Sequence, residues 1–397
     1  MNREDFPMLK KDLIYFDSGA TSLKPSCVIK EITNYYENYS ANSHRGDYDI
    51  SLKVDKMLED TRDKVKDFIN ANSSHEIIFT KGTTESMNMI IFGFMKNYLQ
   101  KDDEVLITKT EHASNVLPWF ILEKETGIKV KYIPLIDNKV TIDKVKESIT
   151  NKTKVISLAW ITNTIGDVRP IKEITKLAHD NNILMVIDGA QSVPHIKTDV
   201  IDTDIDFLAF SAHKMLGPTG VGILYGKFKY LNQMLPLNYG GGMNSFFESD
   251  KTYELKELPE RLEAGTLNLS NILAFSKAID YLNNIGMEKI EKYEKDLKKY
   301  LMNKLKEIEN IEIYNEDTDS GIVLFNIKNI FSEDTSNYLN YYHICVRAGN
   351  HCAKMVKDEL IIKNTCRISL YLYNTKEEID KFIEIMKGNK EIFKVIL

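Results

Sequence analysis

Short apolar runs alternate along the first part of the chain with stretches of helical periodicity. Runs that predict buried strands occupy residues 76–80, 104–108, 130–135, 155–160, 183–187 and 207–211. Amphipathic patterns that predict helices occupy residues 50–69, 142–149 and 171–181. This alternation predicts an α/β fold in which helices cover a mostly parallel sheet.

The last part of the chain predicts a second, smaller lobe. A long helical pattern from 271 to about 308, with a break at Gly286, marks the exit from the sheet region. Strand patterns then occupy 311–314, 321–327 and 344–347, and helical patterns occupy 335–342 and 376–386. We therefore predict a large domain over 22–280 and a small C-terminal α/β domain over 281–397, against which residues 1–21 pack.

Composition narrows the class of protein further. The 397 residues are 43% hydrophobic, which is enough to bury a sizeable core, and the net charge of -6 is mixed along the chain. Neither a nucleic-acid surface nor a basic membrane patch is predicted. No apolar run is long enough to span a bilayer and no leader-like stretch opens the chain, so a cytoplasmic location is expected. The four cysteines form no CxxC pair, so we predict neither a metal site nor a disulfide framework.

Polar side chains follow two of the predicted strands. Asp188 and Gln191 come after the strand 183–187, and Ser211, His213 and Lys214 come at the end of the strand 207–211. Taken singly, the aspartate could cap a turn and the lysine could be an ordinary surface residue. Together they suit a pyridoxal 5'-phosphate (PLP) site, in which the lysine forms the Schiff base and the acid keeps the pyridine nitrogen protonated.

These two segments, DGAQS at 188–192 and SAHKMLGPTGVG at 211–222, resemble the fold-type I PLP-dependent enzymes of the class V aminotransferase family. Within that family they are similar to the cysteine desulfurases of the SufS branch, and the similarity extends from about residue 13 to 387. The resemblance implies a homodimer that converts L-cysteine to L-alanine. It also implies transfer of the sulfur to an acceptor or scaffold protein of the Suf type, for iron–sulfur cluster assembly or related sulfur transfer.

Three further segments match active-site positions of this family, two that bind the cofactor phosphate and one, around His44, that is expected at the substrate. The Gly82-Thr-Thr-Glu85 stretch opens a predicted helix, whose free N–H groups favour an anion, and Thr83 and Thr84 match the family's phosphate-binding threonines. Thr266 matches a threonine that reaches the phosphate of the neighbouring subunit. His44 lies in a segment that reaches the active site of the dimer, although a histidine there could equally cap or cross-link neighbouring elements.

Two other positions are assigned in the same way. His112 stands in Glu111-His-Ala-Ser-Asn115, after a third predicted parallel strand. A histidine at such a strand end is often structural, but the resemblance implies that it stacks on the PLP ring and moves protons. Asn163 matches an asparagine that faces both cofactor and substrate.

The segment Arg347-Ala-Gly-Asn-His-Cys-Ala-Lys354 carries the candidate nucleophile. A cysteine in a short glycine-containing loop beside Arg347 has the exposure and the positive surroundings of a reactive thiol, whereas we take the other three cysteines as small apolar fillers. Cys352 also occupies the family's nucleophile position. Arg367 matches the arginine that binds the substrate carboxylate, because a planar guanidinium can hold a carboxylate in two hydrogen bonds. Arg347 is expected to contribute to the same substrate site.

The chain departs from the family's pattern at two places. Most relatives read GHHCAQP where this chain has Gly349-Asn-His-Cys-Ala-Lys-Met355, which alters the shape of the loop but keeps the cysteine. Relatives that deliver sulfur to a zinc-containing scaffold carry a histidine where this chain aligns Glu333. Two other functions stay open: a selenocysteine lyase or other β-eliminating PLP enzyme on the same fold, and a PLP-binding partner protein without turnover.

Overall fold

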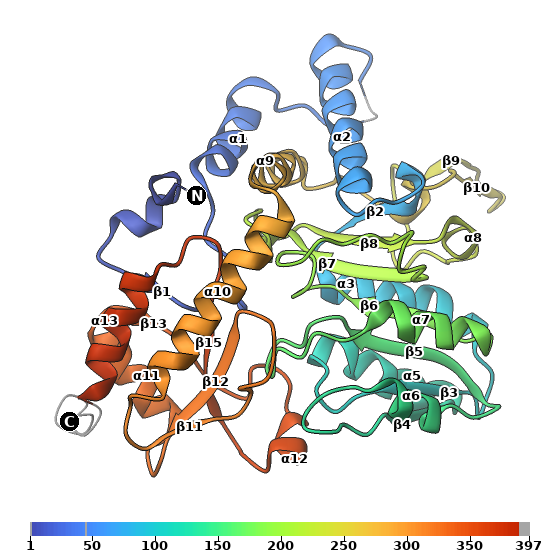
Figure 1. Ribbon diagram of the computed structural model, residues 1–397. Coiled ribbons are helices and arrows are strands. Elements are labelled where there is room, and N and C mark those ends of the chain that lie inside the picture. The colour runs from blue at the N-terminus through green and yellow to red at the C-terminus, as the bar shows by residue number, and fades with distance from the viewer. Residues whose placement is uncertain (1, 44–45, 389–397) are drawn as a thin grey trace.

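The computed structural model of the protein describes residues 2–43 and 46–388, and its two main sheets are each covered by helices (Figure 1). The larger sheet has the strand order β2-β8-β7-β6-β5-β3-β4. Its strands are β2 (Ile77–Thr80), β3 (Glu104–Ile107), β4 (Lys129–Tyr132), β5 (Thr153–Ala159), β6 (Leu184–Asp188), β7 (Phe207–Ser211) and β8 (Gly222–Gly226).

Most of the strand pairs in this sheet are parallel, which confirms the predicted α/β fold. Strand β8 runs antiparallel to its neighbours β2 and β7, whereas the pairs from β7 through β6, β5 and β3 to β4 are parallel. Asp188 pairs with Ala159 on one side and with Ala209 on the other. The carboxyl ends of β5, β6 and β7 therefore meet at one edge of the sheet.

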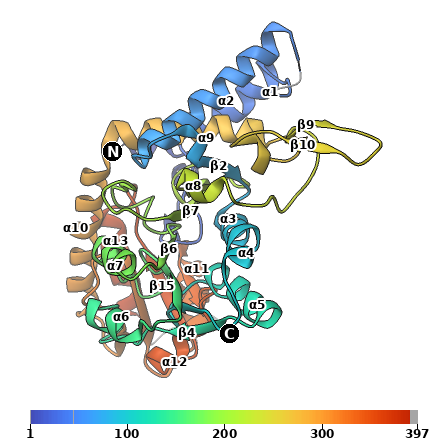
Figure 2. The same ribbon diagram turned by 90° about the vertical axis from the view of Figure 1, so that its right-hand side faces the viewer.

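Helices cover both faces of the larger sheet, as Figure 2 shows with α6 and α7 on one side and α3, α4 and α5 on the other. One face packs against α1 (Ser26–Asn38), α2 (Asp49–Phe68), α6 (Ile142–Ser148), α7 (Ile171–Asp180) and α9 (Leu269–Ile285). The other packs against α3 (Thr83–Asn88), α5 (Leu117–Thr126) and α8 (Phe228–Leu231).

The sequence of β6 does not alternate between apolar and polar residues, because both faces of the strand are buried. Met185 and Ile187 pack on the face covered by α1, α2, α6, α7 and α9. Leu184 and Val186 pack on the opposite face, covered by α3, α5 and α8. A strand buried on both faces needs apolar side chains at every position, and each large one stabilises the fold by roughly 1.5–3 kcal/mol.

The helix that follows β2 contains a segment that periodicity does not predict. Residues Met89–Met95 form a π-helix between α3 and the short α4 (Lys96–Tyr98). At Gly93 a side chain would lie 2.6 Å from the carbonyl oxygen of Leu235, whose own N–H donates to the Gly93 carbonyl at 2.9 Å. Only glycine allows the two backbones to approach this closely.

The smaller sheet has the order β11-β12-β15-β14 and is antiparallel. Its strands are β11 (Ile311–Ile313), β12 (Ile322–Ile327), β14 (Arg347–Gly349) and β15 (Thr365–Ser369), accompanied by α10 (Met287–Leu305), α11 (Ser332–Tyr341), α12 (Val356–Leu360) and α13 (Lys376–Lys387). The strand predicted over 344–347 is divided into β13 (Ile344–Cys345) and β14. β13 pairs in parallel with β1 (Ile14–Tyr15), so the beginning of the chain lies against this sheet.

Gly286 takes the conformation predicted for it, and residues 236–267 form a projecting hairpin. The long helical pattern is broken at Gly286, which has a φ of +91° between α9 and α10. Residues 236–267 contain the hairpin of β9 (Asn244–Phe247) and β10 (Tyr253–Leu255), which projects from the body in Figure 2. Across the described ranges, no helix is both long and apolar enough to cross a membrane.

A histidine on α7 lies between two carboxylates. His179 places Nδ1 2.9 Å from Asp204 and Nε2 2.9 Å from Asp206, and Lys227 binds both carboxylates. Its hydrogen bond to Asp206 raises the pKa of His179 above the ordinary value of 6.5, although burial opposes the shift. Because the folded-state pKa is raised, the stabilisation is complete below the unfolded value and is lost as the pH rises through the folded value.

We predict that His179→Gln lowers the free energy of unfolding at about pH 5.5 by about 1 kcal/mol, and by less at about pH 9. Urea denaturation of both proteins at the two pH values measures this difference. His75→Gln, at an exposed histidine that is hydrogen-bonded to Ser73, is the control. An equal loss at both pH values would contradict the role of the charged imidazole.

Candidate functional site

A cavity of about 180 Å³ opens at the edge of the larger sheet where β5, β6 and β7 end. Most of the residues that the sequence predicted for the site line it. These are Thr83, Thr84, His112, Asn163, Asp188, Gln191, Ser211, His213, Lys214, Arg347 and Arg367. Gly19, Ala20 and His351 are among the other residues that line it.

Two of the predicted residues, Cys352 and Thr266, do not line this cavity. Cys352 is exposed and directly follows His351, which lines the cavity. Thr266 lines a separate pocket of about 390 Å³ beside β2 and α3, so within one chain it does not meet the other cofactor-site residues. His44 lies outside the described residues.

Asp188 is buried and Lys214 is partly buried, and the two influence each other electrostatically. Burial lowers the pKa of Lys214 to about 8, Asp188 opposes that shift, and Arg367 and Arg347 add to it. Burial likewise raises the pKa of Asp188, and the Lys214 charge opposes this. A buried lysine with a lowered pKa keeps a larger fraction of its amine neutral and nucleophilic near neutral pH.

Hydroxyl groups gather at the beginning of α3. The Ser211 hydroxyl accepts from the Thr83 N–H at 2.8 Å and lies 2.7 Å from the Thr83 hydroxyl. The Thr84 hydroxyl lies 2.7 Å from that of Ser114. Strand β8 passes so close that a side chain at Gly222 would lie 2.3 Å from the Cα of Gly82. The close approach keeps this group of hydroxyl and amide donors at the end of the cavity.

The ring of His112 is neutral and has a defined tautomer. Burial, together with the charges of Lys214, Arg347 and Arg367, lowers the pKa of His112 to about 4. The Ser114 N–H donates to Nδ1 at 3.1 Å, so the proton of the neutral ring belongs on Nε2. The next residue, Ala113, donates its N–H to the carbonyl of Cys352 at 2.8 Å. The segment that carries His112 is thereby joined to the cysteine loop.

A buried ion pair supports the His112 segment from behind. The guanidinium of Arg169 binds the Glu111 carboxylate and the carbonyl of Ala159, and both side chains are fully buried. The other carboxylate oxygen of Glu111 accepts from the Ala159 N–H at 2.7 Å and from the Asn115 amide at 2.8 Å. These bonds fix the ends of β3 and β5 relative to each other.

Two buried oxygen atoms beside the cavity have no hydrogen-bond donor among the described residues. The Gln191 amide donates to the Gly19 carbonyl at 2.7 Å and the Asn163 amide donates to the His351 carbonyl at 2.7 Å, but Oε1 of Gln191 and Oδ1 of Asn163 are unsatisfied. A buried acceptor without a donor costs about 1–3 kcal/mol, so these atoms indicate a bound polar group.

The side chains of the cavity fit PLP, the cofactor that the sequence implies. Hydroxyl and amide donors at one end suit a phosphate, the buried Asp188 carboxylate suits a protonated ring nitrogen, and the two unsatisfied oxygens suit polar ring substituents. Within the described ranges, no group of three or more histidine, cysteine, aspartate or glutamate side chains could hold a metal ion.

Arg367 comes from β15 of the smaller sheet and enters the cavity from the opposite side. Its guanidinium is fully buried and donates to Asp17 at 2.8 Å and to the Asn163 carbonyl at 2.8 Å. Its Nε has no acceptor among the described residues. A buried guanidinium with unused donor capacity suits a carboxylate ligand.

The loop that carries Cys352 is held in an uncommon conformation. His351 has a φ of +52° and Cys352 a φ of +59°, a left-handed region that non-glycine residues seldom adopt. Both carbonyls are bound from the larger sheet's side, by Asn163 and by Ala113. Arg347 donates to the Cys352 sulfur at 3.3 Å. The sulfur is thus exposed on a loop with a fixed shape.

The sequence did not single out Asp17, Glu111 and Arg169 as site residues, although Glu111 begins the segment that carries His112. Each acts by supporting a residue that the motifs did identify. A buried arginine gives no signal in composition or periodicity. Its partner Glu111 is separated from it by 58 positions in the chain, so the pair becomes evident only in the folded structure.

Comparisons with known proteins agree on one family. The family model described as "Aminotransferase class-V" matches residues 14–382. A probable cysteine desulfurase of Halalkalibacterium halodurans is 40% identical over 98% of this chain and 97% of its own length. The apo cysteine desulfurase of Thermococcus onnurineus NA1 superposes with a TM-score of 0.94 at 35% identity, covering 98% of this chain and 96% of its own. The Escherichia coli cysteine desulfurase CsdA superposes with a TM-score of 0.92 at 32% identity, covering 98% of each chain.

We predict that Arg169→Met destabilises the fold by about 3–5 kcal/mol, because it leaves the Glu111 carboxylate buried and uncompensated. Urea denaturation of the cofactor-free protein measures the loss. The control is Lys96→Met, which breaks an exposed ion pair with Glu125. A loss no greater than that of the control would show that the network contributes little.

Proposed function

The chain belongs to the aminotransferase class-V family, within its cysteine desulfurases, and we propose that it converts L-cysteine to L-alanine with Cys352 as sulfur acceptor. PLP is the cofactor. The supporting observation is that one cavity joins Lys214 and the buried Asp188 to Arg367, with the exposed Cys352 on the adjoining loop. Lysine and aspartate alone would suit many PLP enzymes, whereas the added thiol suits sulfur transfer.

Several side chains of the cavity would hold the cofactor. Thr83, Thr84, Ser211 and His213 would bind its phosphate, and Gln191 would donate to or accept from a ring substituent. Asp188 would keep the ring nitrogen protonated, and His112 would stack on the ring. When bound, PLP supplies an electron sink for the bonds around the substrate's α-carbon.

Lys214 would hold the cofactor covalently and then move protons. Its lowered pKa of about 8 leaves part of the amine neutral at physiological pH, so it can accept a proton and return it. Neutral His112 has its Nε2 proton available, because Nδ1 is occupied by the Ser114 N–H. Both groups are partly buried, which limits the access of competing water to the proton transfer.

Arg367 would bind the carboxylate of the substrate. Its position is fixed by Asp17 and by the Asn163 carbonyl, so it is ordered before the substrate arrives. Asn163 and Arg347 would complete the substrate site, and Arg347 would also orient the Cys352 sulfur.

Cys352 would take the sulfur in a balanced transfer. Its thiolate forms a bond to the substrate sulfur as the carbon–sulfur bond breaks. The electron pair of that bond stays with the carbon, which takes a proton and becomes the methyl group of alanine. Cys352 is left as a persulfide, which passes its outer sulfur to an acceptor thiol.

The proposal includes an assembly and a destination for the sulfur. We propose a homodimer in which Thr266, with His44, reaches the partner's site, since Thr266 lies away from the cavity of its own chain. Each chain would comprise a large PLP-binding domain over 22–280 and a small domain over 281–397 together with 1–21.

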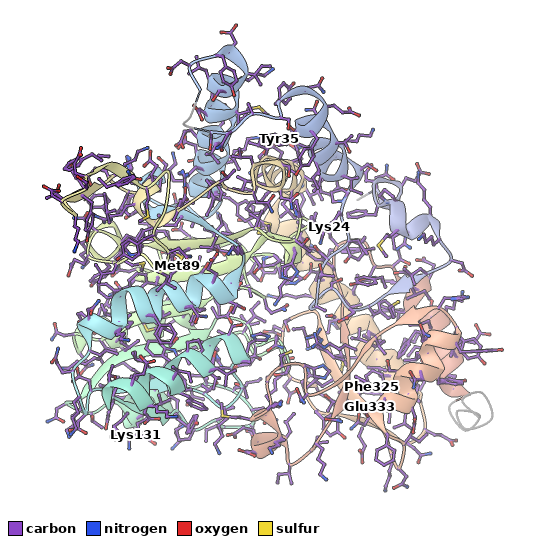
Figure 3. All side chains as sticks on the ribbon, turned by 180° about the vertical axis from the view of Figure 1, so that it is seen from behind. Lys24, Tyr35, Met89, Lys131, Phe325 and Glu333 are labelled. Atoms are coloured by element: carbon purple, nitrogen blue, oxygen red, sulfur yellow. The ribbon has the colours of Figure 1, made fainter. Side chains whose placement is uncertain are left out.

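The acceptor would be a scaffold or carrier of the Suf type serving iron–sulfur cluster assembly, in the cytoplasm, where thiols stay reduced. The position where relatives that use a zinc-containing scaffold carry a histidine is Glu333 in this chain. Glu333, labelled in Figure 3, lies on α11 and accepts from the Asn364 amide at 2.7 Å.

The proposed sulfur transfer predicts that Cys352→Ser keeps its bound cofactor and the spectral change on adding L-cysteine, but loses most of its alanine release. Mass spectrometry of the wild type after brief exposure to L-cysteine should find the added sulfur on the peptide containing Cys352. Cys27→Ser, at an exposed cysteine on α1, is the matched control. Wild-type alanine release by Cys352→Ser would overturn the persulfide, and activity on L-selenocysteine alone would favour a lyase.

The proposed role of Asp188 predicts that Asp188→Asn lowers kcat for alanine release by about a hundredfold or more while cofactor stays bound. The neutral amide cannot favour a protonated ring nitrogen. Alanine release and cofactor content, measured on the same preparation, separate this effect from simple loss of PLP. Asp180→Asn removes a surface carboxylate on α7 and should leave both quantities unchanged. Full activity of Asp188→Asn with full cofactor would remove the role.

A further inference from the structure

The backbone carbonyl directly before Lys214 is bound by an unusual number of donors. The His213 oxygen accepts from the Ser22 N–H at 2.9 Å and from the Ser22 hydroxyl at 3.1 Å. It also accepts from the Thr21 hydroxyl at 3.0 Å and from the Lys24 ammonium at 2.8 Å. A carbonyl oxygen has two lone pairs, so this concentration of donors exceeds what satisfying a buried carbonyl requires.

The ammonium of Lys24 is bound entirely by oxygen atoms that carry no formal charge. Besides the His213 carbonyl it donates to the Ser22 carbonyl and, at 3.2 Å, to the Thr21 hydroxyl. In the described part of the chain, no ion pair to a carboxylate is formed by this group, and burial lowers the pKa of Lys24 to about 7. Figure 3 shows Lys24 between the N-terminal helices and the C-terminal sheet. Burying an ammonium is costly, and an apolar residue of similar length would avoid that cost.

The turn that carries Lys214 is held partly by its own backbone, with the Ala212 N–H donating to the Val221 carbonyl at 3.0 Å and the Gly217 N–H donating to the Ala212 carbonyl at 2.9 Å. Residues Ala212–Lys214 form a single 3-10 turn, closed by the Met215 N–H donating to the Ala212 carbonyl at 2.9 Å. Leu216 then takes a φ of +66°, which is unfavourable for a residue with a side chain. Its N–H donates to the Ser22 hydroxyl at 2.8 Å, the same hydroxyl that binds the His213 carbonyl. Contacts from residues 21–24 therefore add to the turn's own backbone hydrogen bonds in setting its shape.

The same N-terminal segment also binds other parts of the cavity wall. Asp17 holds Arg367, and the carbonyl of Gly19 holds Gln191. A displacement of the segment relative to the Lys214 turn would move the lysine away from groups that bind cofactor and substrate. Shifts of about 1 Å at a reacting group cost on the order of a hundredfold in rate.

We propose that Lys24 is a positioning residue for the reaction: its ammonium holds the His213–Lys214 peptide and so fixes the point from which the Lys214 side chain extends. The proposal rests on the proposed function, in which Lys214 holds the cofactor. Lys24 touches neither cofactor nor substrate and acts through the peptide that it binds. If Lys24 were only a filler, its apolar stem would suffice and its charge would be dispensable.

The test compares Lys24→Met, which keeps the stem without the charge, with Lys24→Arg, which keeps the charge and its donors. Lys30→Met, at an exposed lysine on α1, is the control. In the cofactor-free protein, amide exchange of the 211–217 peptide should rise about tenfold in Lys24→Met, as expected from loss of a charge-assisted hydrogen bond. In the holoenzyme, kcat should fall about tenfold with little change in KM, and the visible absorbance of bound cofactor should shift. Lys24→Arg should recover most of each effect.

Three results would overturn the proposal. The first is a Lys24→Met protein whose amide exchange and kcat equal those of the wild type. The second is a Lys24→Met protein whose kcat falls although amide exchange in the 211–217 peptide is no faster. The third is equal impairment of Lys24→Arg and Lys24→Met. Should Lys24→Met fail to fold, Thr21→Val removes another donor to the same carbonyl and should raise exchange in the same peptide; unchanged exchange there would overturn the proposal as well. The exchange measurement needs no substrate, so it can be read even if the wild type releases no alanine, which would count against the proposed function alone.

Discussion

Parallel pairing of the central strands is the constraint on which the rest of the molecule depends. Strands that run in the same direction must be joined by crossovers on the sheet faces, and they bring all of their carboxyl ends to one edge. Asp188 is held beside Ala159 and Ala209 by the register of three adjacent strands. The chain then continues two residues beyond Ala209 to Ser211 before it turns, and Lys214 lines the same cavity as the aspartate. The backbone ladder thus determines which polar groups can meet.

The smaller sheet supplies the two arginines of the cavity. Arg347 and Arg367 enter the cavity from β14 and β15, while Lys214 and Asp188 enter from the larger sheet. Among the residues that line the cavity, Lys214, Arg347 and Arg367 face one carboxylate, Asp188, while Asp17 pairs with Arg367. Burial lowers the pKa values of Lys214 and His112, the two arginine charges add to the shift, and the positive charge favours anionic ligands with a phosphate or a carboxylate.

The sequence predicted the elements and the motif residues better than the contacts between them. Continuous apolar runs identified β5, β6 and β7 because strands buried on both faces need such runs, and the break at Gly286 was evident from its flanking helical patterns. The π-helix at Met89–Met95 was missed, because its apolar positions also satisfy an ordinary helical period. The contacts of Arg169 and Lys24 were missed for a different reason. Their partners lie tens to hundreds of positions away, and local pattern carries no information on such pairings.

The fixed shape of the Cys352 loop has a consequence for how sulfur leaves the molecule. A loop whose carbonyls are bound at His351 and Cys352 has little freedom to swing outward. In the proposed reaction, the persulfide sulfur on Cys352 would therefore stay in place. The thiol of the acceptor would have to approach it. An acceptor with a thiol on a mobile arm would be served well, and one with a recessed thiol poorly. Selectivity among acceptors would then come from reach and shape, and the rate of sulfur delivery would rise with acceptor concentration.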